Sequence, residues 1–224
     1  MRPAKTLLVS LVCTGLLAAC AGNQPPAVTH DGLVLDKSIT RAEVYKKPGA
    51  SLASYDEYGL VPCQVAFKKN WLRDQNQNRL DLSNRVTQRD VDRIKDQLSA
   101  DCDRYFREAL LQSPPYTLVE NFSEGEEVLI LRPSIINLDV SAPDVMSAGM
   151  SRTYTTSAGE MTLFLEVIDA TTHEVLFRVV DRQRAMDTGR LEWTNSVTNR
   201  ADADRALRRW ASQLRQALDS AHGK

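Results

Sequence analysis

Cysteine thiols have the most distinctive chemistry in this chain, because a thiol can carry a lipid, form a disulfide or bind a metal ion. The chain has four of them, Cys13, Cys20, Cys63 and Cys102, and three scattered histidines. No two cysteines have the C-x-x-C spacing of common zinc sites, and the histidines do not cluster with them. The sequence therefore predicts no metal and no cofactor, which leaves lipid attachment and disulfide formation as the chemistry of these thiols.

Two other arrangements that could support catalysis are weak. Ser151 lies in GMSRT, which begins like a nucleophile elbow but lacks the closing glycine. The carboxylates of Glu126 and Glu127 are adjacent, and neighbouring side chains on a strand point to opposite faces, so one site cannot easily use both. We interpret these residues as a loop serine and a solvated turn, and we predict no catalytic residues and no enzymatic activity.

Cys20 stands at the end of a short apolar run that follows a basic amino-terminus. The run is too short for a membrane span, which needs about 20 apolar residues, and its basic start and small-residue exit are typical of an export signal. Residues 17–20, LAAC, resemble the lipobox of bacterial lipoproteins, whose signal is cut before a cysteine that carries acyl chains. An ordinary signal cut after Ala21 is the alternative, because Ala19 and Ala21 also form a small-x-small site.

The lipobox resemblance implies a mature chain that begins at Cys20 and is anchored to a membrane without spanning it. Several acyl chains make such an anchor durable, since each buried CH₂ contributes about 0.8 kcal/mol. In the lipoproteins that this signal resembles, an aspartate after the cysteine tends to retain the protein in the inner membrane, so Ala21 favours the periplasmic side of the outer membrane. We expect a signal peptide over residues 1–19, a lipidated tether over 20–32 and one globular domain over 33–224.

The composition is that of an ordinary globular protein. Apolar residues make up 42% of the chain and charged residues 25%, and 28 basic and 29 acidic side chains are interspersed to give a net charge of −1. Because no basic stripe exists to bind phosphates, and because export separates the chain from the cytoplasm, we predict no nucleic-acid partner.

Once Cys20 is assigned to lipid and Cys13 to the signal, Cys63 and Cys102 are the remaining thiols. An oxidising periplasm favours their pairing. Cys63 lies on the alternating apolar face of a predicted strand, and Cys102 lies in the apolar stripe of a predicted helix, so the sulfurs can meet if the stripe covers that face. Two buried free thiols remain the alternative, because the sequence supplies no Cβ geometry.

Hydrophobic periodicity predicts the order strand, helix, four strands, helix. Thr87 and Asp90 form the start signal of the first helix, and the Ser-Glu-Gly-Glu run at 123–126 is typical of a hairpin turn. We predict an α+β fold of two layers, a mostly antiparallel five-stranded sheet with two helices on one face. The strands are expected over Leu60–Trp71, Tyr116–Phe122, Val128–Val140, Glu160–Asp169 and Glu174–Arg184, the helices over 87–112 and from an Asn199 cap onward, and an irregular arm over Leu33–Tyr58.

The connection 141–158 contains few charges amid several apolar side chains. Such a connection most often covers a sheet edge as a loop. Flexible methionine-containing segments also adapt to partners, so this one is a possible contact surface for an envelope protein. The residues that would make the contact are Val145, Met146, Met150 and Tyr154.

Short motifs spread over nearly the whole chain after the signal carry a family resemblance. They include Val44-Tyr45, Pro48-Gly49, Val61-Pro62, Trp71-Leu72-Arg73-Asp74, Ala142-Pro143-Asp144, Trp193-Thr194 and Trp210-Ala211. Together they resemble an uncharacterised family of Gram-negative envelope lipoproteins, known only as a domain of unknown function. That resemblance implies no activity. We expect a non-enzymatic lipoprotein that binds a protein partner or serves an envelope assembly, or, as the alternative, a protein that binds a small amphipathic ligand between its sheet and helices.

Overall fold

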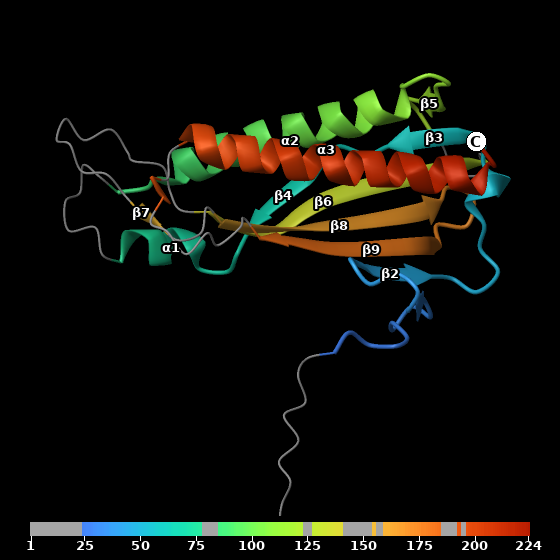
Figure 1. Ribbon diagram of the computed structural model, residues 1–224, viewed down its shortest axis with the longest axis horizontal. Helices are drawn as coiled ribbons and strands as arrows, with labels where there is room; N and C mark the ends of the chain where they lie inside the picture. Colours follow the sequence, from blue (N-terminus) through green and yellow to red (C-terminus); the bar gives the residue numbers. More distant parts are fainter. Residues whose placement is uncertain are drawn as a thin grey trace, which may run out of the picture.

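The chain forms one large sheet with long helices packed on one side of it (Figure 1). The computed structural model describes residues 24–77, 85–122, 127–140, 154–155, 159–184, 192–193 and 196–224. The strands of the large sheet are β1 (Val34–Leu35), β2 (Glu43–Lys46), β3 (Glu57–Leu60), β4 (Gln64–Phe67), β5 (Thr117–Val119), β6 (Val128–Val140), β8 (Gly159–Asp169) and β9 (Val175–Arg184). The helices are α1 (Trp71–Asn76), α2 (Gln88–Leu110) and α3 (Ser196–Ala221), with a 3-10 turn η1 (Leu52–Ser54). Strands β7 (Tyr154–Thr155) and β10 (Glu192–Trp193) form a separate two-stranded sheet.

Strand β6 is the axis of the large sheet, whose order is β1-β2-β9-β8-β6-β3-β5 with β4 also paired to β6. On one side β6 pairs with β8 in antiparallel fashion. On the other side it pairs in parallel first with β3, where Glu57 faces Val128, and then with β4, where Gln64 faces Ser134. Strands β3 and β4 therefore follow each other along one edge of β6, and the break between them contains Pro62, which has no N–H to donate to a ladder.

The prediction of a mostly antiparallel, five-stranded sheet is wrong in number and in direction. Within the described residues the sheet has eight strands and is mixed, because β3 lies between β5 and β6 and runs parallel to both. The predicted hairpin between β5 and β6 therefore does not form. The segment predicted as an irregular arm supplies β1, β2 and β3, and the predicted strand over Leu60–Trp71 is divided between β3, β4 and α1. The α+β class, the bounds of β6, the β8–β9 hairpin and the placement of both long helices on one face are confirmed.

Helix α2 begins as its sequence predicts. Thr87 is the N-cap and forms a reciprocal capping box with Asp90. The buried side of the helix then packs on the sheet through residues spaced three or four apart. The side chains of Leu98, Cys102, Tyr105, Phe106 and Leu110 join Leu129, Leu131, Ile135, Leu163 and Leu165 of the central strands in one apolar core.

Helix α3 is fixed to the end of α2 by a buried arginine. The Arg215 guanidinium, 7% exposed, donates hydrogen bonds from Nη1 to the carbonyls of Ala109, Leu110 and Gln112, and from Nη2 to the carbonyl of Pro114. The last carbonyls of a helix have no partner within the helix. Arg215 therefore caps α2 from the neighbouring helix, while its Nε donates to Asp219 at 2.9 Å. The predicted Asn199 cap is wrong, because α3 already begins at Ser196.

We expect Arg215→Leu to lower the free energy of unfolding by about 3 kcal/mol, because the substitution removes the Arg215 donor from several carbonyls at the end of α2 and from the Asp219 carboxylate. The matched control is Arg205→Leu on the exposed side of α3, where Arg205 pairs with Asp202 one turn away. That variant should change stability by no more than about 0.5 kcal/mol. Urea unfolding followed by circular dichroism measures both, and equal unfolding curves would show that the buried cap contributes nothing.

Candidate binding cleft

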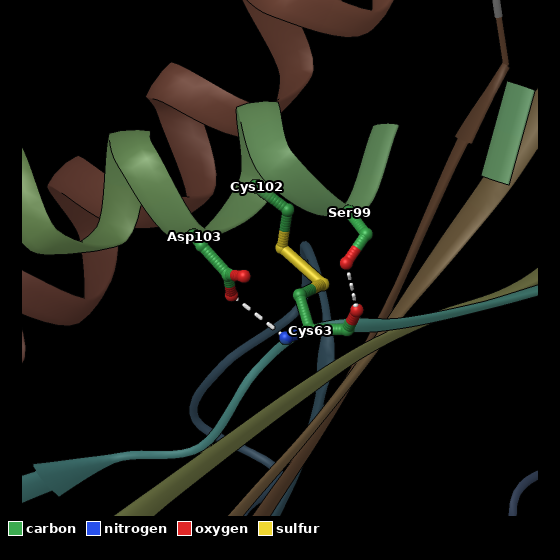
Figure 2. Close-up of a disulfide and its surroundings, with 4 residues drawn as sticks. All are labelled: Cys63, Ser99, Cys102 and Asp103. Carbon is green, nitrogen blue, oxygen red and sulfur yellow. Dashed lines mark hydrogen bonds between the residues drawn. A yellow bond between two sulfur atoms is a disulfide. The ribbon is translucent and has the colours of Figure 1, made fainter. Parts of the chain in front are cut away.

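The predicted disulfide is present and joins α2 to the break between β3 and β4. Cys63 and Cys102 are bonded, with their Cα atoms 6.2 Å apart. Figure 2 shows that polar contacts flank the bond on both sides: the Asp103 carboxylate accepts from the Cys63 N–H at 2.7 Å, and the Ser99 hydroxyl donates to the Cys63 carbonyl at 2.6 Å. Burial raises the pKa of Asp103. These three contacts fix α2 against the edge of the sheet formed by β4.

A second polar contact sets the position of α3 above the sheet. The indole Nε1 of Trp210 donates to the carboxylate of Asp181 in β9 at 2.8 Å. The Asp181 side chain is 4% exposed, and it also accepts a hydrogen bond from Gln183 at 2.7 Å. A buried carboxylate needs such partners, because unpaired burial of a charge costs several kcal/mol. The pair therefore ties the middle of α3 to β9.

An apolar cleft of about 640 Å³ lies between α3 and the outer strands β9 and β2. Its floor is made by side chains on the helix-covered face of the sheet, and one wall is made by α3. The lining residues of the strands are Val44, Leu163, Leu165, Val167, Phe177 and Val179, those of the helix include Trp210, Leu214 and Ala217, and Leu52 of η1 completes the apolar part. Ala217 belongs to the apolar stripe of α3 but is exposed, because it faces the open cleft.

The rim of the cleft is polar and carries more positive than negative charge. It is formed by the loop over residues 36–42, by the outer end of β2 and by the exposed side of α3. Lys46 of β2 lies 5.5 Å from the centre of the Phe177 ring, and the exposed Arg41 lies in the loop. Asp36 is the acidic rim residue, and hydrogen bonds from the Ser38 hydroxyl and N–H lower its pKa.

The amino-terminal arm over residues 24–36 fixes this loop from the other side of the sheet. Arg178 of β9 points away from the helices, because it alternates with Phe177 and Val179, and its Nη2 donates to Asp31 at 2.6 Å and to Glu166 of β8 at 2.8 Å. The hydrogen bond from Arg178 lowers the pKa of Asp31. Burial alone would raise the pKa of Glu166, but hydrogen bonds from Arg132 and Arg178 outweigh it and lower the value. Leu33 of the arm is also fully buried, so the arm is held on the sheet just before the loop that forms the cleft rim.

Most of the other residues singled out in the sequence lie where the structure makes no statement. Cys20, Ser151 and three residues of the proposed contact loop, Val145, Met146 and Met150, are outside the described residues. The backbone of Tyr154 lies in β7, where it pairs with Trp193 of β10. The lipidation site and the contact surface therefore stay predictions.

The described part of the chain contains no cluster of three or more His, Cys, Asp or Glu side chains arranged to hold a metal ion. In the same residues, no helix has the length and apolar character needed to cross a bilayer.

Together these features define a two-layer α+β protein with a mixed sheet and an apolar cleft beside one of its helices. Residues 30–214 match the family model described as "Protein of unknown function (DUF3313)", and the chain belongs to this family. The predicted membership of a family of unknown function is confirmed, and its lipoprotein character stays a prediction.

Comparisons with individual proteins add little. No curated protein matches the chain. It is similar to two crystal structures of the PelC dodecamer from Paraburkholderia phytofirmans, one of them a point variant, with TM-scores of 0.39 and 0.36 for the unmodified protein and the variant. Both are 9% identical in sequence, and the similarity covers 79% of this chain and 96% of theirs. Similarity at this level carries no functional argument.

We expect joint replacement of Cys63 and Cys102 by serine to lower the free energy of unfolding by about 4 kcal/mol, because the bond closes a long loop in the unfolded chain. The cysteines are 39 residues apart in sequence. Urea unfolding of the two proteins measures the difference, and Ser99→Ala is the control, since it removes one neighbouring hydrogen bond worth about 1 kcal/mol. Two titratable thiols in protein isolated under oxidising conditions, with unchanged stability on substitution, would contradict the expectation.

Proposed function

We propose that this protein is a lipoprotein of the bacterial envelope, anchored in the outer membrane by acyl chains on Cys20 and facing the periplasm. Its domain acts there as a non-enzymatic binding component, an accessory to an envelope assembly. The observation that carries the binding role is the apolar cleft, an open concavity of about 640 Å³ between the sheet and α3.

Two features support export and anchoring. The residues before Cys20 have the lipobox pattern, with leucine at 17 and alanines at 18 and 19. The Cys63–Cys102 disulfide supports the same assignment, because structural disulfides form and persist mainly in oxidising compartments.

The chain length between anchor and domain supports a role close to the membrane surface. The N–H of Leu35 in β1 donates to the Ala27 carbonyl at 2.9 Å, so the chain is already attached to the sheet at Ala27. Ala27 is the seventh residue after Cys20, and a fully extended chain over seven residue steps reaches about 25 Å. The edge of the sheet that carries β1 and β2 therefore lies within that distance of the proposed lipid attachment point.

A protein partner is the first candidate for what is bound. Residues Val145, Met146, Met150 and Tyr154 supply flexible apolar side chains of the kind that adapt to partner surfaces. The second candidate is a small amphipathic ligand, and the cleft favours it specifically: its volume lies within the range of about 300–1,000 Å³ typical of small-molecule sites, and its lining is largely apolar.

We expect Cys20→Ala to abolish incorporation of radiolabelled palmitate and to remove the protein from the outer-membrane fraction, because no acyl chain can then be attached. Cys13→Ala is the matched control, since it replaces a cysteine within the same signal and should leave labelling and location unchanged. Metabolic labelling followed by separation of the membranes on a sucrose gradient measures both properties. A Cys20→Ala protein that still labels and still fractionates with the outer membrane would disprove the anchor.

We expect replacement of Val145, Met146, Met150 and Tyr154 by serine to remove a stoichiometric protein partner from cross-linking in cells, because the apolar contact area is lost while the chain length is kept. The control replaces residues 78–83 by an equally long Gly-Ser sequence. Cross-linked products are identified by mass spectrometry, with circular dichroism to verify folding. A partner retained by the serine variant at the level of the control would show that this connection is not the contact surface.

A further inference from the structure

We propose that the cleft between α3 and strands β9 and β2 binds one acyl chain that carries an anionic head group. This inference deepens the second candidate function, and it does not depend on lipid being attached to Cys20.

The distribution of polarity in the cleft matches an amphipathic molecule. The buried part of its lining is apolar and includes Leu163, Leu165 and Leu214. Trp210 also lines it, and its one polar atom is already bonded to Asp181, so it offers no unpaired donor to the interior. The polar lining residues belong to the loop, the outer end of β2 and the exposed side of α3, all at the rim. An apolar chain would replace water along the floor while a polar head group stays at the surface.

The charge at the rim selects an anionic head group. Lys46 and Arg41 are both exposed, and within the described part of the chain neither forms an ion pair. The neighbouring Lys47 differs, since it pairs with Glu174 outside the cleft. Asp36 is the one acidic lining residue, and its carboxylate accepts two hydrogen bonds from Ser38. Hydrogen bonds from Ser38 and the nearby Lys46 keep the Asp36 carboxylate ionised, so the rim carries two cations and one anion. Its net positive charge attracts a carboxylate or a phosphate and disfavours a cationic head group.

The cleft lies near the point where the amino-terminal arm joins the sheet, so a lipid could reach it from a bilayer. The loop at the rim continues directly from the arm and β1, and Figure 1 shows β2 and the arm at one edge of the sheet. Under the proposed anchor, the short chain between Cys20 and Ala27 keeps this edge within about 25 Å of the membrane surface. The cleft then lies close to the membrane lipids, whose acyl chains could occupy it.

The test uses the full chain, isolated in its membrane-bound form and reconstituted in phosphatidylcholine vesicles. A palmitic acid that carries a diazirine on its chain is added, the sample is irradiated, and labelled peptides are identified by mass spectrometry. We expect the label on peptides of β9 and α3, those containing Phe177 and Leu214. Labelling confined to other surfaces would overturn the proposal.

Two variants of α3 separate specific occupancy from adsorption. Ala217→Trp places a large ring at an exposed position of the cleft wall and should reduce labelling of these peptides at least fivefold. Gln216→Trp adds the same ring at the neighbouring exposed position, which does not line the cleft, and should leave labelling unchanged. Thermal unfolding verifies that both variants fold. Equal labelling of folded Ala217→Trp and Gln216→Trp would disprove binding in the cleft.

The head-group preference is tested separately and needs no variant of the wall. On the unmodified chain, unlabelled palmitate should compete better than hexadecanol, which has the same chain length without the charge. The double variant Lys46→Glu with Arg41→Glu should lower palmitate labelling about fivefold, as expected for two exposed ion pairs, and should leave labelling by a diazirine hexadecanol unchanged. Lys69→Glu with Arg89→Glu, a double reversal of exposed cations away from the cleft, is the charge-matched control. If unlabelled palmitate and hexadecanol compete equally well with the diazirine palmitate, the proposal of an anionic head group is wrong.

The source of the acyl chain is distinguished by the vesicle composition. If phosphatidylglycerol replaces part of the phosphatidylcholine and suppresses labelling, the occupant is a chain of a membrane lipid; if labelling is unchanged, it is a free fatty acid, and both results support the proposed chemistry. Failure of cleft labelling is distinguishable from failure of the envelope proposal, because the latter is decided by palmitate incorporation at Cys20 and by fractionation.

Discussion

The arrangement of the molecule depends on where α3 is held. Arg215 reaches the carbonyls at the end of α2, and Trp210 reaches the carboxylate of Asp181 in β9, so two polar contacts fix the helix both along its axis and across the sheet. Apolar packing alone is non-directional and tolerates sliding, whereas buried hydrogen bonds are costly to leave unmade and hold only at one position. The Cys63–Cys102 disulfide likewise fixes the position of α2, at the edge of the sheet where β3 and β4 meet.

The two long helices, α2 and α3, are too narrow to cover one whole face of the large sheet. Packed helices lie about 8–10 Å apart and strands about 4.8 Å apart, so a pair of helices covers roughly four strands. The sheet has seven strand positions across, from β1 to β5. One edge of the helix-covered face must therefore be left to other parts of the chain, and among the described residues the loop over 36–42 and η1 lie beside β9 and β2. The cleft is the part of that uncovered face that the loop does not fill.

Local sequence signals predict the helices and strands well, but they predict poorly which strands pair with each other in the sheet. The bounds of β6, the β8–β9 hairpin and the capping box at Thr87 follow from periodicity and short-range chemistry, and the pairing of Cys63 with Cys102 follows from two faces that pack together. The insertion of β3 between β5 and β6 could not be predicted, because alternation determines which face a side chain takes but does not determine which strand lies beside it.

The cleft could not be predicted from the sequence, because the burial of two residues of α3 differs from what their side-chain types suggest. Arg215 would be placed on the surface by its charge, and its burial makes sense only once the end of α2 lies against it. Ala217 would be placed in the core by its position in the apolar stripe, and its exposure makes sense only once the sheet is known to run past the helix. The two departures have different causes: the end of α2 buries Arg215, whereas Ala217 is exposed because it faces the open cleft. Both follow from where α3 is docked, which is a long-range property that neither residue indicates by itself.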